Sequence, residues 1–209
     1  MRVLVLCDDY YHLAPVTRGG LAPLGEEFDF DFVEDVSDWS PASLSEYPVV
    51  VLSKSNNTSS KKTDPWMTDE VQEALRAYVA AGDGLLAIHS GTASYREAKV
   101  LRATLGGVFI QHPPQALVTM QPKAGHPLTE GSAAYAAQDE HYFMELDDAD
   151  ADVFLTTVSE HGEQPGGWTR TEGKGRVCVL TPGHNVEVWL HPSFQTLLRN
   201  ALNWCAGQS

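Results

Sequence analysis

Short apolar runs recur along this 209-residue chain, and polar or glycine-containing segments separate them. Four of these runs lie at residues 3–7, 49–52, 84–88 and 176–181. Each run is too short to cross a membrane and has apolar residues at consecutive positions, as strands do when both faces of a parallel sheet are covered. The pattern therefore predicts a sheet with buried central strands.

Other segments show different periods. Residues 28–33 alternate between apolar and acidic side chains, which predicts a strand at the edge of the sheet. Thr68 is a good N-cap for a helix that has an acidic first turn and stops before Gly82. The pattern also predicts a weak helix at 17–27, helices at 95–105 and from Pro192 onward, strands at 108–110, 116–121 and 152–158, and a loop at 162–167.

The alternation of strands and helices predicts an α/β fold, a three-layer sandwich of flavodoxin-like type. The length suits one ordinary domain, so we expect a single domain over residues 1–209. There are no internal repeats or linker-like tracts in the sequence.

Composition narrows the classes of partner. Lys and Arg total 14 against 28 Asp and Glu, a net charge of -14, so a nucleic acid partner is not expected. No apolar run reaches the length of a membrane span, so we expect a soluble protein with no membrane partner. Cys7, Cys178 and Cys205 lie in apolar segments without metal or redox spacing, as in a reduced cytoplasmic protein. Whether the chain forms a homo-oligomer is left open.

The stretch at residues 84–92, Gly-Leu-Leu-Ala-Ile-His-Ser-Gly-Thr, is typical of a buried strand that breaks into a polar turn. Working residues of doubly wound sheets project from the carboxyl ends of such strands. The small residues Ala87 and Gly91 flank His89 two positions away on either side, as a sharp elbow requires. We therefore place His89 at the active centre.

Histidines recur where predicted strands or turns end. His12, His89, His112 and His184 should meet at one rim, and His141 follows Asp139 and Glu140. These imidazole and carboxylate groups could either bind a metal ion or transfer protons. A divalent metal, with zinc as the best candidate and no other cofactor expected, would have as ligands His89, His112, His141 and His184. Proton transfer without an ion would use as catalytic residues His89, Glu140, His141 and His184. Polar residues expected to bind the substrate are Asp8, His12, Asn56, Ser90 and Tyr142.

Two common chemistries lack their motifs. Neither usual form of glycine-rich phosphate loop is present, which argues against nucleotide hydrolysis and nicotinamide binding. A serine hydrolase elbow needs glycine two residues before and after the serine, but Ile88 and Thr92 flank Ser90 at those positions.

Taken together, motifs in order along nearly the whole chain resemble the ThuA-like family, named for trehalose utilisation, within the class I glutamine amidotransferase-like superfamily. They are Ile88-His89-Ser90, Gly106-Gly107-x-Phe109 followed by His112, His126-Pro127, Asp139-Glu140-His141-Tyr142, Gly173-Lys174-Gly175-Arg176-Val177, Gly183-His184 and Trp204. The resemblance implies a flavodoxin-like fold and a role in sugar catabolism. Glutamine amidotransferases have a nucleophilic cysteine at the elbow, where this chain has His89, so release of ammonia from glutamine should be absent.

Three hypotheses follow. The first is an enzyme of carbohydrate catabolism, a hydrolase or lyase, whose small-molecule substrate is a sugar or keto-sugar derivative. The second is a non-catalytic sugar-binding or regulatory module on an amidotransferase-like fold. The third is an amidotransferase-type hydrolase that uses Ser90.

Overall fold

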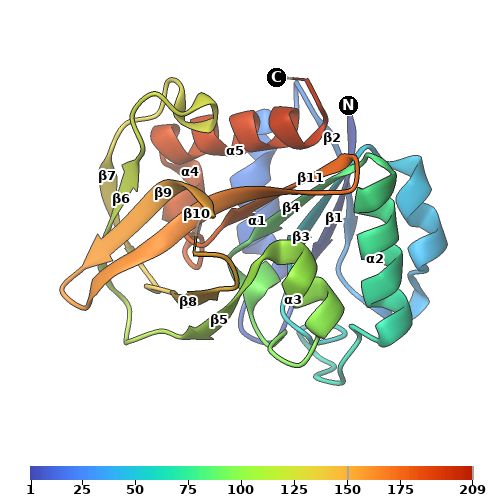
Figure 1. Ribbon diagram of the computed structural model, residues 1–209. Helices are drawn as coiled ribbons and strands as arrows, with labels where there is room; N and C mark the ends of the chain where they lie inside the picture. The colour runs from blue at the N-terminus through green and yellow to red at the C-terminus, as the bar shows by residue number, and fades with distance from the viewer. Residues whose placement is uncertain (150, 209) are drawn as a thin grey trace.

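A computed structural model describes residues 1–149 and 151–208, and Figure 1 shows a central sheet with helices on both of its faces. The described residues form a nine-stranded sheet in the order β2-β1-β3-β4-β11-β10-β9-β6-β7. Its strands are β1 (Arg2–Cys7), β2 (Asp29–Val33), β3 (Val49–Ser53), β4 (Gly84–Ile88), β6 (Ala116–Pro122), β7 (Tyr135–Asp139), β9 (Asp152–Ser159), β10 (Gly162–Glu172) and β11 (Gly175–Leu180). A separate pair is formed by β5 (Gly107–Gln111) and β8 (Phe143–Leu146).

The five strands β2, β1, β3, β4 and β11 are parallel to one another. Their order corresponds to the 2-1-3-4-5 order of flavodoxin-like folds, in which ligands bind where the chain direction switches between the first and third strands. As predicted from its alternation, β2 lies at the edge of the sheet. The carboxyl ends of β1, β3, β4 and β11 therefore share one rim.

Helices cover both faces of this parallel part, which confirms the three-layer sandwich. One face packs against α1 (Ala14–Leu21), α4 (Val186–Leu190) and α5 (Pro192–Cys205), and the other against α2 (Asp69–Ala81) and α3 (Lys99–Leu105). Alternate residues of β1 serve the two layers, since Val3 and Val5 point to the first and Leu4 and Leu6 to the second. In the described part of the chain, no helix has both the length and the apolar composition needed to cross a bilayer.

Some helix boundaries agree with the sequence-based predictions, and others differ from them. The Thr68 hydroxyl accepts a hydrogen bond from the backbone N–H of Val71, so α2 begins where its cap was predicted. The first helix starts earlier than predicted, at Ala14, and its continuation is a short 3-10 turn. Short 3-10 segments occur at Ala22–Leu24, Val36–Asp38, Pro41–Glu46, His89–Thr92 and Pro127–Thr129.

Two predictions were wrong in type. The segment 162–167, predicted as a loop, begins the long strand β10, because it pairs as a hairpin with β9 despite a register irregularity between Pro165 and Gly167. Glycine is needed at Gly167, where a Cβ atom would come within 2.9 Å of Phe154. Residues 95–98, predicted as helix, precede α3 as a turn, in which the buried Tyr95 donates a hydrogen bond to the carbonyl oxygen of Lys54.

Candidate functional site

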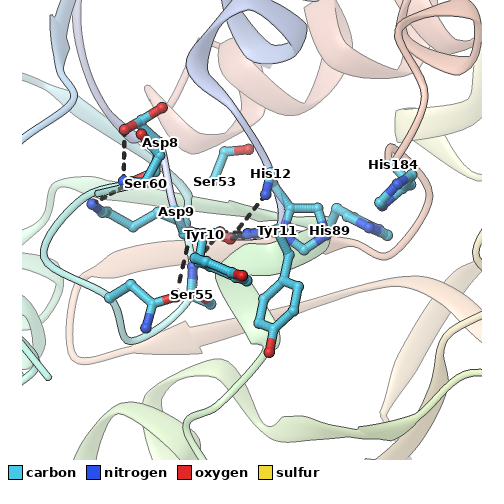
Figure 2. A network of polar contacts seen from close by, with 12 residues as sticks. Asp8, Asp9, Tyr10, Tyr11, His12, Ser53, Ser55, Ser60, His89 and His184 are labelled. Atoms are coloured by element: carbon cyan, nitrogen blue, oxygen red, sulfur yellow. Dashed lines mark hydrogen bonds and ion pairs between the residues drawn. The ribbon is translucent and has the colours of Figure 1, made fainter. Parts of the chain in front are cut away.

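Four side chains from distant segments converge at the shared rim of the sheet. They follow four different strands: His12 lies beyond β1, His89 directly after β4, Glu140 directly after β7, and His184 beyond β11. One potential ligand atom from each lies within 4.8 Å of every other. Figure 2 shows the rings of His12, His89 and His184 next to one another.

Glu140 lies at the centre of this group. Its Oε2 atom is 3.1 Å from Nδ1 of His184, 3.5 Å from Nε2 of His89 and 3.8 Å from Nε2 of His12. The first two nitrogens are buried, yet neither has the geometry of a hydrogen bond to any residue that the structure describes. Two imidazole nitrogens therefore point toward a carboxylate oxygen without being satisfied by it, which is costly unless another group binds there.

A backbone carbonyl orients the ring of His89, and Asp139 holds the main chain at His184. His89 donates from Nδ1 to the carbonyl oxygen of Thr181 at 2.8 Å, which leaves a lone pair on Nε2, the nitrogen that faces Glu140. The backbone N–H of His184 donates to the buried carboxylate of Asp139 at 2.9 Å, as does the N–H of Gly183. Nδ1 of His12 is instead hydrogen-bonded to the Asp9 carboxylate, as Figure 2 shows.

The electrostatics favour metal-ligating states of Glu140 and His89, but not of His12. Burial on its own raises the pKa of Glu140, but the nearby rings of His12, His184 and His89 outweigh it and hold that pKa far below the usual range. Burial lowers the pKa of His89 to about 4, so this imidazole is neutral near pH 7. Burial also disfavours charge on His12, but Asp9 and Glu140 raise its pKa to about 9. An anionic Glu140 and a neutral His89 are the forms that bind metal ions, whereas His12 would have to release a proton to bind one.

The strand-to-turn elbow has the geometry that the sequence indicated. His89 has a positive φ of 48°, which non-glycine residues rarely adopt and which the surrounding structure must enforce. A Cβ atom at Gly91 would lie 2.0 Å from the carbonyl oxygen of Leu52, so the turn packs directly on β3. Ser90 is buried, and its hydroxyl makes no hydrogen bond to any described residue, so it lacks the contact to a base that an activated serine makes.

A cavity of about 340 Å³ opens beside the cluster. It is lined by Tyr11, His12, Ser55, Ala93, Ser94, Phe109, His112, Glu140 and Tyr142. The Tyr142 ring stacks on His89 with centroids 3.9 Å apart and packs against Phe109, which forms an apolar wall behind the polar groups. His112 is at the mouth, with Nε2 3.6 Å from Oε1 of Glu140.

The structure sorts the predicted histidines into two groups. His89 and His184 lie in the cluster as predicted, and His12, predicted at the same rim but assigned to substrate binding, lies with them. The cluster does not include His112, which contacts the other Glu140 oxygen, nor His141. Both ring nitrogens of His141 face hydroxyl groups, Nδ1 that of Ser159 at 2.7 Å and Nε2 that of Thr157 at 3.2 Å. The group of side chains that could together hold a metal ion therefore includes His12 and Glu140, and it does not include His112 or His141.

Among the residues expected to bind substrate, Tyr142 lines the cavity, whereas Asp8 and Asn56 hold loops. The Asp8 carboxylate accepts hydrogen bonds from the backbone of Ala14 and Ser60. The Asn56 side-chain oxygen accepts from the backbone N–H groups of Trp66 and Met67. Sequence reasoning missed the roles of Asp9 and Thr181. The position of Asp9 directly after a buried strand was an available signal for the first.

Comparisons with known proteins agree with this architecture. Residues 2–205 match the family model described as ThuA, trehalose utilisation. The chain belongs to the ThuA family. This confirms the family that the sequence motifs indicated. No curated protein matches the sequence significantly.

Solved structures similar to this ThuA family chain show the fold. A protein described as ThuA-like from Parabacteroides merdae has a TM-score of 0.79 at 20% identity, covering 99% of this chain and 90% of that chain. A cytoplasmic protein from Salmonella typhimurium has a TM-score of 0.69 at 17% identity, covering 98% and 99%. A protein from Thermoplasma acidophilum, described as one subunit of a GMP synthase, reaches 0.61 at 13% identity, covering 99% and 94%. The last confirms the glutamine amidotransferase-like fold.

Proposed function

We propose that this protein is a metal-dependent enzyme of carbohydrate catabolism that acts on a sugar or keto-sugar derivative. Its metal ligands are His12, His89, His184 and Glu140, and zinc is the ion that suits them best. The observation that carries the proposal is the convergence of three imidazole nitrogens on one carboxylate oxygen, with two of those nitrogens buried and unpartnered.

The donor set fits a divalent transition metal. Imidazole nitrogen and carboxylate oxygen are the donors of catalytic zinc sites, whereas magnesium and calcium prefer oxygen alone. An ion among the four groups would satisfy Nε2 of His89 and Nδ1 of His184. Of the ligands, His12 and Glu140 also line the cavity, so a water or substrate could join the four protein ligands from that side, as a catalytic ion would need.

When bound, such an ion polarises a carbonyl or hydroxyl oxygen and lowers the pKa of a coordinated water. Residues of the chain supply the remaining parts. His112 at the mouth is placed to exchange a proton with a substrate held beside Glu140. Tyr142 and Phe109 exclude water from one side, and the cavity volume lies at the small end of the range for small-molecule sites.

The choice of a carbohydrate rests on the family, whose description is trehalose utilisation. A cytoplasmic setting is supported by three free, buried cysteines and by the printed description of the Salmonella relative. If the protein bound a sugar but did not convert it, the result would instead favour a non-catalytic sugar-binding or regulatory module.

The test begins with metal-free protein titrated with zinc, manganese and cobalt, followed by incubation of each loaded form with keto-disaccharides and their parent glycosides. We expect one bound ion per chain, and expect Glu140→Gln to weaken its binding by about tenfold or more. Glu145→Gln is the matched control, because Glu145 is exposed and pairs with Arg102 away from the cluster. Absence of binding to the wild type, or equal affinity in both variants, would refute the metal site. Turnover that survives His89→Ala unchanged would refute the catalytic centre.

A further inference from the structure

We propose that Asp9 is a positioning residue for the metal site: its carboxylate holds the His12 ring so that Nε2 points at the ion, and in this way sets the affinity of the site. The inference rests on the proposed metal-dependent function. It adds Asp9, which is not one of the four ligands and which acts on the site through the ligand His12.

Asp9 is fully buried, and each of its carboxylate oxygens has defined partners. Oδ1 accepts hydrogen bonds from the backbone N–H groups of Tyr11 at 2.9 Å and His12 at 3.0 Å. Oδ2 accepts from the backbone N–H of Ser55 at 2.8 Å. These contacts tie the loop after β1 to the loop after β3, so the carboxylate is held from two neighbouring strands and is not free to turn (Figure 2).

The same carboxylate meets the His12 ring. Nδ1 of His12 lies 2.9 Å from Oδ1 and 3.2 Å from Oδ2 of Asp9. An ionised carboxylate only accepts hydrogen bonds, so the ring must donate from Nδ1. That leaves Nε2, on the opposite side of the ring and 3.8 Å from Oε2 of Glu140, as the atom that can ligate an ion. Carboxylate partners of this kind fix the orientation of ligating histidines and raise their basicity.

The main chain reinforces this arrangement. The backbone N–H of Asp9 donates to the carbonyl oxygen of His12 at 3.0 Å, and the N–H of His12 approaches the carbonyl of Asp9 at 3.3 Å. The segment from Asp9 to His12 is thus closed on itself. His89, by contrast, has a backbone carbonyl as the partner of its Nδ1, and the contact of His184 with Asp139 goes through its main chain. All three imidazoles face Glu140, but among the described contacts His12 is the one whose other ring nitrogen meets a second carboxylate.

The neighbouring Asp8 offers a matched control for a merely structural role. It is also buried, and its carboxylate also accepts backbone hydrogen bonds, from Ala14 at 3.0 Å and Ser60 at 2.8 Å. No described hydrogen bond or ion pair joins its side chain to the rings of the cluster. Asp8→Asn therefore removes the same charge from the same loop as Asp9→Asn, without touching a metal ligand.

The experiment compares zinc dissociation constants of wild type, Asp9→Asn and Asp8→Asn, measured by competition with a chromogenic chelator. In Asp9→Asn, the amide NH₂ can face Nδ1 of His12, which moves the ring proton to Nε2 and blocks ligation. We expect a loss of affinity of about 10- to 100-fold for Asp9→Asn and less than about threefold for Asp8→Asn. In a His12→Ala background, the effect of Asp9→Asn should vanish, because Asp9 acts through that ring. Equal losses in the two asparagine variants, or a loss that persists without His12, would overturn the inference.

The wild-type protein supplies a measurement that needs no variant to fold. In cadmium-loaded protein with ¹⁵N-labelled histidine, we expect ¹¹³Cd coupling to Nε2 of His12 and a proton on its Nδ1. Coupling to Nδ1 would overturn the inference while leaving the metal site intact. Failure of the wild type to bind zinc or cadmium at all would refute the proposed function itself, so the two failures are distinguishable.

Discussion

The Nδ1 atom of His89 lies 2.8 Å from the carbonyl oxygen of Thr181, which joins the turn after β4 to the end of β11. A neutral imidazole that donates from one nitrogen presents a lone pair on the other, and here that nitrogen faces Glu140. Because the residue is buried and has a positive φ of 48°, the ring is held by both backbone and packing. His89 is therefore held in the orientation that the proposed metal site requires.

Removal of this ring should abolish tight metal binding. We expect His89→Ala to weaken zinc affinity by more than about 100-fold, since a direct ligand matters more than an outer partner. His141→Ala is the control, because His141 is equally buried and is adjacent to Glu140, but its nitrogens face Ser159 and Thr157. Calorimetric titration of both variants decides the point. Equal weakening by the two substitutions would contradict the division of the histidines described above.

The elbow should tolerate no side chain at Gly91. A Cβ atom there would come 2.0 Å from the carbonyl oxygen of Leu52, which belongs to a buried strand and cannot move aside. We expect Gly91→Ala to lower the free energy of unfolding by about 3 kcal/mol or more, measured by urea denaturation. Gly19→Ala in α1 meets only ordinary contact, at 3.4 Å from Val186, and should be neutral or stabilising by up to about 1 kcal/mol. If Gly91→Ala were as stable as Gly19→Ala, the close packing of the elbow on β3 would be wrong.

Much of this site could be predicted because its histidines follow strands with strong apolar signals. His89 and His184 come after β4 and β11, whose buried runs are clear in the sequence, and parallel strands bring their carboxyl ends to one rim. The edge position of β2 followed from simple alternation in the same way. The local hydrophobic pattern was sufficient to predict a site residue where the pattern identified a strand and the residue followed the end of that strand.

The remaining assignments depended on contacts that no local pattern contains. Glu140 and His141 are adjacent, and only one points into the cluster. Which one does depends on β7 (Tyr135–Asp139), an edge strand of Tyr-Ala-Ala-Gln-Asp that lacks β-branched residues and was not predicted. The role of His12 likewise depends on Asp9, and Asp8 beside it looks equivalent in the sequence. Only the structure shows that both aspartates accept backbone hydrogen bonds and that Asp9 also meets the ring of His12.

The aromatic wall of the cavity should support both stability and the position of His89. Tyr142 is buried, stacks on His89 at a centroid distance of 3.9 Å, and packs against Phe109 at 4.2 Å. We expect Tyr142→Ala to cost about 3–5 kcal/mol of stability, because it leaves a ring-sized void. Tyr142→Phe keeps the ring and removes only the hydroxyl, 3.4 Å from Nε2 of His12, and should cost less than about 1 kcal/mol. Similar unfolding midpoints for the two variants in urea would count against the packing role.

Lys54 is a buried cation outside the proposed metal site. Its ammonium group donates hydrogen bonds to the carbonyl oxygens of Asp8 at 2.8 Å, Thr58 at 2.9 Å and Glu34 at 3.3 Å, which belong to three separate loops. The side chain is fully buried, and burial lowers its pKa from 10.5 to about 8. The ammonium group of Lys54 thus links the loop that begins with Asp8 to the loops that contain Glu34 and Thr58. Removing this charge from water costs free energy.

Replacement of this lysine should have an effect that depends on pH. Lys54→Met leaves three carbonyl groups without their donor, so we expect a loss of about 2 kcal/mol or more in the free energy of unfolding at pH 7. Between pH 8 and 10.5, the unfolded chain binds a proton at Lys54 that the folded chain has released, so the wild type gains stability as the pH rises. The difference between wild type and Lys54→Met should therefore widen across this window, by up to about 1.4 kcal/mol per pH unit. Urea denaturation of both proteins at pH 7, 8.5 and 9.5 measures it, and the subtraction cancels groups that titrate equally in the two. A gap that stays constant or narrows would mean that the folded pKa of Lys54 is not depressed, and that the ammonium is less buried among these carbonyls than described.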